Sequence, residues 1–324
     1  MALRGGVDLG GTKIEAVVAD EGGHVSGRAR MPTPTQGGPQ AVASAITAAM
    51  REAATGAGVE VQTLAGVGVG SPGTVSDGTV SHARNLPDWE DAFPLAETVG
   101  AALGVPVEVA NDVSVAVDAE AALGAGRGRR SLLGVWWGTG VGGSIVVEGK
   151  RWLGRGAAGE IGHMVVKMGG RRCDCGNRGC LEAYAGRGSM ERRARQLVER
   201  GEKTDLFELM EKHGRPRLTS GIWERALDKG DKVAEQLIDE AYAALGAGIG
   251  SAVNLTDVEA VVIGGGLGTR FGDRAVTRIA SEMHPHLFVR ERPPDVIPAE
   301  LGDLGGAIGA SLLVSAAPEK QVTA

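Results

Sequence analysis

A glycine-rich turn between two apolar segments occurs twice in this sequence, and it constrains the fold more than any other feature. The first copy, "DLGGTKIEAVV", spans residues 8–18, and the second, "GTGVGGSIVVEGK", spans residues 138–150. In both copies the turn leads into a run of apolar and β-branched residues that is typical of a strand. The repeat predicts two related halves, each built around a glycine-rich β-turn.

Strand-like and helix-like segments alternate around these turns. Residues 64–73 and 105–112 are apolar runs typical of buried strands, whereas residues 39–58 have the apolar spacing of a helix and end at glycines. This alternation predicts an α/β sheet that is at least partly parallel. Further along, we expect helices over 186–253, a buried strand with a third glycine turn over 258–268, a closing helix over 306–317 and a frayed tail over 318–324.

The bulk composition excludes several classes of protein. The sequence has no run of about 18 apolar residues, which excludes a membrane-spanning helix. A formal net charge of −6 argues against general binding to nucleic acid or to an anionic membrane. Glycines and an aspartate interrupt the N-terminal "MALRGGVDLGG", so we do not expect a signal peptide there. These observations indicate a soluble protein of the cytoplasm.

The glycine spacing raises the question of nucleotide-binding motifs. Residues 138–143 and 68–73 both match the dinucleotide fingerprint G-x-G-x-x-G, but strand-like residues follow each match. The fingerprint requires a helix directly after it, so a Rossmann site is disfavoured, and a Walker A sequence is absent. Two interpretations remain: an ordinary hairpin turn, or a turn whose glycines adopt positive φ so that successive N–H groups converge on a phosphate.

The repetition of the turn, together with the third glycine cluster, favours phosphate binding. In the first turn, Asp8 would hold a metal-bound water, while Thr12 and Lys13 would offer a hydroxyl and a positive charge to the phosphate.

All three cysteines lie within eight residues, in the spacing His163-x9-Cys173-x-Cys175-x4-Cys180. An odd, clustered set is a poor disulfide framework. Three thiolates and an imidazole fill a tetrahedral zinc site with no open position, so zinc would be structural here. The alternative is a group of incidental buried cysteines.

Two glutamates, Glu160 and Glu182, flank the cysteine cluster. Zinc bound in this loop would fix both carboxylates, and His163 could bind the metal with one ring nitrogen while donating from the other. Paired carboxylates with an imidazole N–H suit a polyhydroxylated ligand. Each acid taken alone is more simply a solvated surface residue, and the placement of the two around the cluster is what favours a ligand.

Asn111 and Asp112 stand where an apolar strand gives way to a helical segment. Both residue types are favoured helix N-caps, so capping alone is one interpretation. The carboxyl end of a strand in an α/β sheet is also where ligands bind. There Asp112 could accept a proton from a sugar hydroxyl that attacks phosphorus.

Taken together in their order along the chain, the motifs resemble those of the ROK family (repressors, open reading frames and kinases), and within it those of the glucokinase-type sugar kinases. The resemblance covers essentially the whole chain, and GH-x9-CxCGxxGCxE is its most specific part. Ser144 departs from the third glycine of the family's GTGxGGG, which bears on how closely the second turn packs on its phosphate. The matching motifs are "DLGGTK", "GSPGTV", "RNLPDW", "AND", "GTGVGG", "GEIGH", "CDCGNRGCLE" and "IGGGLG".

The resemblance implies an actin-like ATPase fold (hexokinase/Hsp70, ribonuclease H-like) with two α/β domains around a cleft. We expect a small domain of residues 1–116 and 303–324, which carries the first phosphate turn and the catalytic aspartate. Residues 117–302 would form the large domain, with the second phosphate turn, the zinc loop and the adenosine side. The implied reaction is ATP-dependent phosphorylation of a hexose, foremost glucose to glucose 6-phosphate.

The resemblance also implies roles for individual residues. Asp112 would be the general base, Mg²⁺ would accompany ATP, and His163, Cys173, Cys175 and Cys180 would bind structural Zn²⁺. The residues implied to hold the sugar are Gly73, Asn85, Asn111, Asp112, Glu160, His163 and Glu182. Those implied to face ATP are Asp8, Gly10, Gly11, Thr12, Lys13, Gly138, Thr139, Gly140, Gly142, Gly143, Gly264, Gly265 and Gly266.

Alternatives to an ATP-dependent glucokinase remain. One is a kinase of an amino sugar, mannose or a cyclitol. Another is an enzyme that takes its phosphoryl group from polyphosphate, although "GRGRR" and "RRARQLVER" are more simply solvated surfaces. A sugar-responsive repressor is disfavoured because Asp8 leaves no room for a preceding helix-turn-helix domain. The resemblance further implies a homodimer, with no nucleic-acid or membrane partner.

Overall fold

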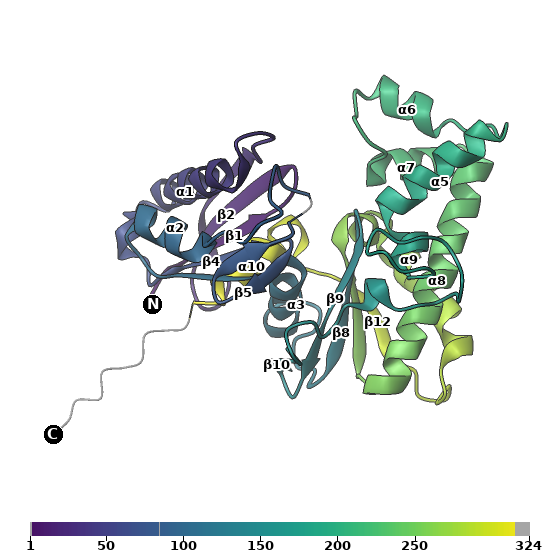
Figure 1. Ribbon diagram of the computed structural model, residues 1–324. Helices are drawn as coiled ribbons and strands as arrows, with labels where there is room; N and C mark the ends of the chain where they lie inside the picture. The colour runs from purple at the N-terminus through teal and green to yellow at the C-terminus, as the bar shows by residue number, and fades with distance from the viewer. Residues whose placement is uncertain (1, 84, 315–324) are drawn as a thin grey trace. The chain divides into compact units, whose positions relative to one another are not determined.

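The structure is a computed structural model that describes residues 2–83 and 85–314. The chain forms two compact units (Figure 1): unit 1 runs up to Arg127 and resumes at Glu300, and unit 2 spans Gly128–Ala299. Unit 2 is therefore an insertion into unit 1. The boundary expected at residue 116 falls inside helix α3 (Asp112–Ala122). A boundary there would divide a continuous helix, so we place it after Arg127.

Unit 1 is built on a five-stranded sheet of order β3-β2-β1-β4-β7. The β1–β2 and β2–β3 pairs are antiparallel, whereas β1–β4 and β4–β7 are parallel. The strands are β1 (Arg4–Leu9), β2 (Lys13–Ala19), β3 (Val25–Pro32), β4 (Val67–Ser71) and β7 (Val107–Asn111), with a small hairpin of β5 (Thr74–Ser76) and β6 (Thr79–Ser81). The helices are α1 (Gly38–Gly56), α2 (Leu95–Leu103), α3 (Asp112–Ala122) and α10 (Gly305–Ser311).

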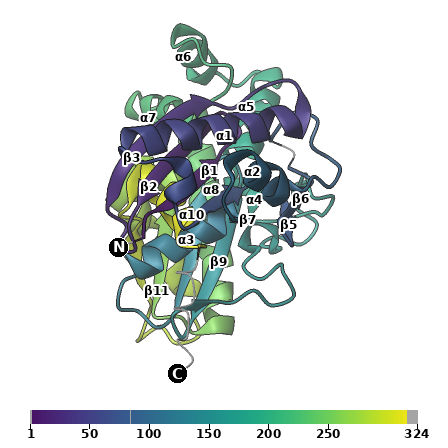
Figure 2. The same cartoon turned by 90° about the vertical axis from the view of Figure 1, so that its left-hand side faces the viewer.

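Helices cover both faces of this sheet (Figure 1 and Figure 2). Neighbouring residues of a strand point to opposite faces. A Cβ at Gly5 would meet Met50 of α1, whereas a Cβ at Gly6 would overlap the carbonyl of Ala307 in α10. The sheet therefore lies between α1 on one face and α10 on the other.

Glycine makes the α10 layer possible. A Cβ at Gly68 of β4 would overlap the carbonyl of Ala310, and a Cβ at Gly309 would overlap the carbonyl of Val115 in α3. Because these positions have no side chain, the helix backbone lies directly against the strand and against α3. The closing helix expected over 306–317 begins at Gly305 and ends at Ser311, and residues 315–317 and the tail at 318–324 lie outside the described residues.

A buried glutamate joins the two places where the chain passes between the units. Glu120 of α3 is only 2% exposed. Its carboxylate accepts hydrogen bonds from the backbone N–H groups of Ala125 at 2.9 Å, Glu300 at 3.0 Å and Leu301 at 2.9 Å. The same side chain thus holds the segment that leaves unit 1 and the segment that returns to it.

Unit 2 repeats the sheet of unit 1, with the order β10-β9-β8-β11-β12. Corresponding strand pairs have the same directions as in unit 1: β8–β9 and β9–β10 are antiparallel, and β8–β11 and β11–β12 are parallel. This correspondence confirms the internal repeat predicted from the two glycine turns. The strands are β8 (Leu132–Trp137), β9 (Val141–Val147), β10 (Lys150–Arg151), β11 (Ala260–Gly264) and β12 (Asp295–Pro298).

The remaining mass of unit 2 is helical. Helix α9 packs on β8, β11 and β12, and the long α8 packs on α9. Trp137 contacts two other aromatic rings in this core. Its ring centroid lies 5.2 Å from that of Tyr242 and 5.6 Å from that of Phe271. The helices are α4 (Glu182–Ala185), α5 (Arg187–Glu199), α6 (Leu206–Lys212), α7 (Ser220–Asp228), α8 (Lys232–Thr256) and α9 (Gly265–Met283).

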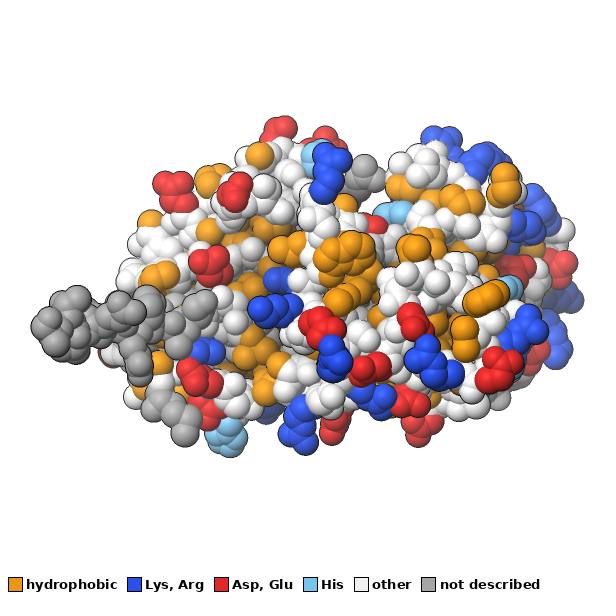
Figure 3. Space-filling view, turned by 90° about the horizontal axis from the view of Figure 1, so that it is seen from below, with side chains coloured by type: hydrophobic (Ala, Val, Ile, Leu, Met, Phe, Trp, Pro, Cys, Tyr) orange, Lys and Arg blue, Asp and Glu red, His pale blue; other side chains and the backbone are white. Residues whose placement is uncertain are grey.

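Within the described residues, none of the helices has the length and apolar character needed to cross a membrane. On the face seen in Figure 3, acidic and basic side chains are interspersed.

Candidate functional site

The first glycine turn is a tight hairpin that brings Asp8 to the carboxyl end of β1. The N–H of Gly10 donates to the carbonyl of Lys13 at 2.9 Å, which closes the turn. The ammonium of Lys13 lies 3.5 Å from Glu15 and 3.8 Å from Asp303. Lys13 therefore reaches the edge of the turn, where two acids hold it.

Asn111 and Asp112 stand where β7 ends and α3 begins. The Oδ1 atom of Asn111 accepts hydrogen bonds from the N–H groups of Val113 at 3.1 Å and Ser114 at 3.2 Å, so Asn111 is the N-cap of α3. Capping fixes the side-chain orientation and leaves the amide NH₂ group as a donor. A Cβ on Gly70 of β4 would lie 3.4 Å from the Cα of Asp112, so this glycine lets the start of α3 approach the sheet.

Asp8 and Asp112 interact electrostatically, although they are about a hundred residues apart in the sequence. Burial, and secondarily the negative charge of Asp112, raise the pKa of Asp8 to about 7, and Lys13 opposes the increase. Two carboxylates in a partly buried place favour binding of a cation between or beside them.

Gly73 occupies a position that has no room for a side chain, and Asn85 lies beside the first glycine turn. Gly73 has a φ of 93°, and a Cβ there would lie 2.6 Å from the carbonyl oxygen of Ser81. Asn85 packs against the first glycine turn, because a Cβ on Gly11 would lie 3.0 Å from its carbonyl oxygen. Asn85 is exposed and thus accessible to a ligand.

The second glycine turn joins β8 to β9 and contacts Glu182. One carboxylate oxygen of Glu182 accepts a hydrogen bond from the N–H of Val141 at 2.8 Å, and a side chain on Gly140 would overlap it. The spacing around the cysteines did not indicate this contact, because it joins segments 41 residues apart. Glu182 therefore supports the second turn directly.

The positive φ angles expected for these two turns are absent. None of Gly10, Gly11, Gly138, Gly140, Gly142 and Gly143 has a positive φ. Glycine is required by close approach instead: a Cβ on Gly143 would lie 2.7 Å from the carbonyl oxygen of Gly159. Ser144 is buried in β9 opposite Gly134, so the departure from the family's motif lies in the strand and not in the turn.

The third glycine cluster differs from the other two because a helix follows it. Strand β11 ends at Gly264, and α9 begins at Gly265. Gly265 has a φ of 79°, and a Cβ there would lie 2.7 Å from the carbonyl oxygen of Trp137. The first N–H groups of α9 are therefore available to an anion. Arg187, which no motif indicated, donates from Nη2 to the hydroxyl of Thr139 in the second turn at 2.8 Å.

His163, Cys173, Cys175 and Cys180 come together, with their four donor atoms all within 4.8 Å of one another. The sulfur atoms of Cys175 and Cys180 are 3.7 Å apart, and Nδ1 of His163 is 3.9 Å from the sulfur of Cys173. A tetrahedral zinc with Zn–S bonds of about 2.3 Å requires sulfur atoms ~3.8 Å apart. The donor set and spacing therefore fit a metal ion. Burial raises the pKa of Cys173 to about 12, so a thiolate there requires a nearby cation.

Glu160 lies on the side of His163 that faces away from the cysteines. Its carboxylate is 3.9 Å from Nε2 of His163, while Nδ1 points to the cysteine cluster. The histidine can thus use one ring nitrogen for a metal and keep the other beside an exposed carboxylate.

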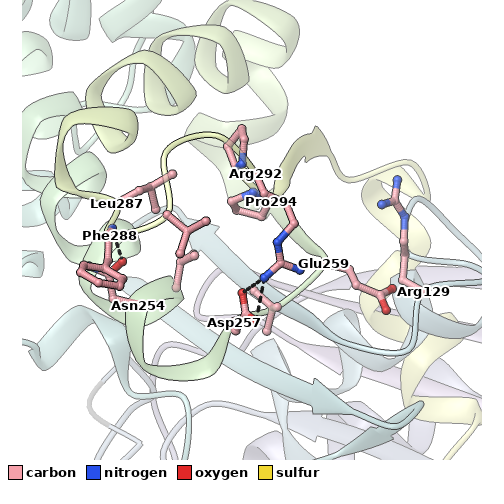
Figure 4. Close-up of a pocket in the computed structure, with 12 residues that line it drawn as sticks. Arg129, Asn254, Asp257, Glu259, Leu287, Phe288, Arg292 and Pro294 are labelled. Atoms are coloured by element: carbon pink, nitrogen blue, oxygen red, sulfur yellow. Dashed lines mark hydrogen bonds and ion pairs between the residues drawn. The ribbon is translucent and has the colours of Figure 1, made fainter.

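A separate cavity of about 470 Å³ lies elsewhere in unit 2 (Figure 4). Arg129, Asn254, Asp257, Phe288 and Arg292 are among the residues that line it. Arg292 donates to both carboxylate oxygens of Asp257, at 3.0 and 3.1 Å. None of the predicted site residues lines this cavity.

Comparison with known proteins connects these features to a family. Residues 4–317 match the model of the ROK family. A glucokinase of Streptomyces coelicolor is 35% identical over 96% of this chain and 97% of its own length.

Two solved structures are similar over nearly their whole length. A ROK hexokinase from Thermus thermophilus is 34% identical with a TM-score of 0.79, covering 96% of this chain and 97% of that one. A ROK family glucokinase from Streptomyces griseus, in complex with glucose and AMPPNP, is 33% identical with a TM-score of 0.81, covering 96% and 99%.

The raised pKa of Asp8 predicts a stability difference that depends on pH. An acid whose pKa rises on folding costs no stability below its unfolded value, about 4, and the cost grows until pH 7. Each pKa unit is worth about 1.4 kcal/mol. Asp8→Asn should therefore melt close to the parent at pH 4.5 and be more stable by at most about 4 kcal/mol at pH 8.

Thermal unfolding at the two pH values, without nucleotide or Mg²⁺, measures this difference. The exposed Asp91→Asn serves as the control and should melt like the parent at both. A constant difference between Asp8→Asn and the parent across this range would contradict the electrostatic account.

Proposed function

The chain belongs to the ROK family, and from this premise we propose that it is an ATP-dependent sugar kinase of the glucokinase type. It has the actin-like ATPase fold of the family's sugar kinases and converts glucose to glucose 6-phosphate. We expect the enzyme in the cytoplasm, because its substrates ATP and glucose are found there.

The position of Asp112 carries the mechanism. Its carboxylate lies at the carboxyl end of the unit 1 sheet, at the start of α3 and in electrostatic contact with Asp8. In open α/β sheets ligands bind at this edge. Asp112 accepts the proton of the sugar's terminal hydroxyl as its oxygen forms a bond to the γ-phosphorus. The bond from that phosphorus to the bridging oxygen breaks, and ADP leaves.

The glycine turns hold the donor. The first turn, with Thr12 and Lys13, and the second turn, with Thr139, bind the phosphates, and the start of α9 lies on the adenosine side. Mg²⁺ bound with ATP would neutralise charge on the phosphate oxygens, and Asp8 would hold it through water. A cation there also favours the charged form of Asp8, which burial disfavours.

Each unit has its own candidate sugar-binding residues. In unit 1, the capped Asn111 offers its NH₂ group, and Gly73 and Asn85 are further candidates. In unit 2, Glu160 and the Nε2 atom of His163 offer an acceptor and a donor for neighbouring hydroxyls, joined by Glu182. Tethered by the cysteine cluster, His163 stays in one orientation.

The metal is a structural zinc ion. The spacing of the four donor atoms of His163, Cys173, Cys175 and Cys180 supports a closed tetrahedral site. Zinc held by these four protein atoms would have no open position, so it would fix the sugar-binding loop and take no part in the chemistry.

Asp112→Asn tests the base. The variant keeps a cap-compatible shape but cannot accept a proton, so turnover should fall by at least about a thousandfold. Glucose affinity, measured by calorimetry, should change by less than about fivefold, since the side chain's hydrogen-bonding shape is kept. Glu108→Gln, an exposed acid on β7, is the matched control and should keep full activity.

The assay follows ADP release from Mg-ATP with glucose, mannose, N-acetylglucosamine, N-acetylmannosamine and a cyclitol. We expect the highest kcat/KM with glucose. Near-normal turnover by Asp112→Asn would refute the assignment of the base, and silence of the parent with every sugar would refute the kinase.

Replacing Cys175 tests the zinc. The purified protein should contain about one zinc per chain, measured by atomic emission, and Cys175→Ser should hold much less. Because the loop then loses its clamp, KM for glucose should rise about tenfold or more while KM for ATP changes little. Met168→Ser, which alters an exposed residue of the same loop, should retain the zinc. A fully active, zinc-free parent would be inconsistent with this role.

We propose that the protein is a homodimer. Its subunits would meet through an apolar face at the end of α8, formed by Leu255 and Phe288. Leu255 and Phe288 are 86% and 89% exposed, which is unusual for large apolar side chains. Asn254 accepts from the N–H of Phe288 at 2.8 Å, and this bond holds the segment in place (Figure 4).

Phe288→Asp should therefore convert the dimer to a monomer of 33.2 kDa, because a charge in an apolar contact is costly. Light scattering after gel filtration gives the mass. Met168→Asp, at another exposed apolar position, should stay dimeric. A monomeric parent would disprove the assembly.

A further inference from the structure

A cavity of about 340 Å³ in unit 2 lies between α5 and the loop of residues 171–180, which we call the cysteine loop. Four of the residues that line this cavity are arginines, two from the cysteine loop and two from one face of the helix. A serine and an amide side chain add further hydrogen-bonding groups. None of these residues is among those assigned above to the sugar, to ATP or to the metal. They are Arg171, Arg172, Ser189, Arg192, Arg193 and Gln196.

Two of the four arginines have carboxylate partners. Arg192 is bound to Asp174 at 2.9 Å, and Asp174 is the one acid among the described residues that line the cavity. Arg171 is bound to Glu240 of α8, and its guanidinium lies over the ring of Tyr184 at 4.7 Å from the centroid. Four guanidinium groups thus face two carboxylates, which leaves two positive charges without compensation.

The other two arginines, Arg172 and Arg193, form no ion pair among the described residues. Arg193 reaches only a neutral acceptor, the amide oxygen of Gln196, at 3.4 Å from Nη1. Two nitrogen atoms of the lining residues, Nη1 of Arg171 and Nε of Arg193, are buried and have no hydrogen-bond acceptor. Buried donors in proteins are nearly always paired, so this cluster lacks an acceptor that carries negative charge.

This lining suits a phosphate group. Guanidinium forks and a hydroxyl match phosphate oxygens, and a phosphate dianion carries the charge that the cluster leaves uncompensated. A nucleobase would need aromatic or apolar surface, and no aromatic side chain is among the described residues that line the cavity. We propose that Arg172 and Arg193, together with Arg171 and Ser189, bind a phosphate group, either as the free ion or on a small metabolite, and that the bound group ties the cysteine loop to α5.

The two segments that meet at this cavity support different parts of the proposed active site. The cysteine loop holds the metal ligands that tether the sugar-binding histidine. Helix α5 begins against the second glycine turn: the N–H of Arg187 donates to the carbonyl of Gly138, and the N–H of Gly188 donates to that of Thr139, both at 3.1 Å. A phosphate bound between the segments restrains one against the other, so its concentration regulates the affinity for sugar. This regulation rests on the proposed function, whereas the binding does not.

Calorimetry with inorganic phosphate tests the site on the full-length protein, at constant ionic strength and without sugar or nucleotide. We expect saturable binding to the parent. Arg172→Gln/Arg193→Gln removes the two unpaired charges, and its Kd should be at least about tenfold higher, the equivalent of one lost charged hydrogen bond. Arg200→Gln/Arg215→Gln removes the same charge from exposed positions of unit 2 and should bind phosphate like the parent.

Hydrogen exchange locates the bound ion. Phosphate should slow amide exchange in residues 171–180 and 189–196 of the parent, but not in the double variant Arg172→Gln/Arg193→Gln. Repeating both measurements with glucose 6-phosphate distinguishes the two sources of the ligand. Tighter binding of the ester, with protection of the same segments, would assign the cavity to a phosphorylated sugar, and tighter binding of inorganic phosphate would assign it to the free ion.

The regulation is measured as KM for glucose at saturating Mg-ATP. Added phosphate should lower this KM at least about twofold in the parent, because the restrained loop holds its histidine in place, and leave it unchanged in the double variant.

The outcomes separate this proposal from the kinase. Failure of both ligands to bind, or equal affinities in the parent and the double variant, would overturn the site. Binding and protection with a constant KM would overturn the regulation and leave the kinase intact. A chain that binds phosphate at these segments but phosphorylates no sugar would support the site and refute the kinase.

Discussion

The burial of Asp8 beside a second acid, Asp112, is the constraint on which the site edge of unit 1 depends. Burial of a carboxylate, and secondarily a like charge beside it, oppose folding, and the raised pKa of Asp8 expresses that cost. The sheet nevertheless holds both residues at one edge, because Gly70 has no side chain to keep α3 away from β4. A cation bound beside these carboxylates would offset the cost, so this edge is suited to a ligand at the expense of its own stability.

Much of this arrangement could be predicted from the sequence. The repeated turn indicated two similar sheets, and both sheets have the same strand order and directions. Local patterns were sufficient because strand periodicity and helix caps are local properties. The cysteine spacing likewise predicted a cluster whose donor atoms do come together.

Contacts between distant segments could not be predicted in this way. Glu182 was expected beside the sugar through its place near the cysteines, yet its carboxylate also bonds to the backbone of the second turn. The predicted conformation of the turns was wrong as well. Glycine is needed there because neighbouring atoms leave no room for a side chain, and not because the backbone has a positive φ. Sequence identifies a glycine but not which of these two reasons requires it. Arg187 matched no motif, since its partner Thr139 lies 48 residues away.

The insertion of unit 2 also determines the order in which the molecule can be completed. During synthesis α10 emerges after the whole of unit 2, yet it is the helix that covers the glycine-lined faces of β1 and β4 and packs on α3. Until then, those faces of unit 1 stay open to water, whereas unit 2 has its entire sequence available to fold. The helix that carries Asp112 therefore gains one of its neighbours only after the whole of unit 2 has been synthesised.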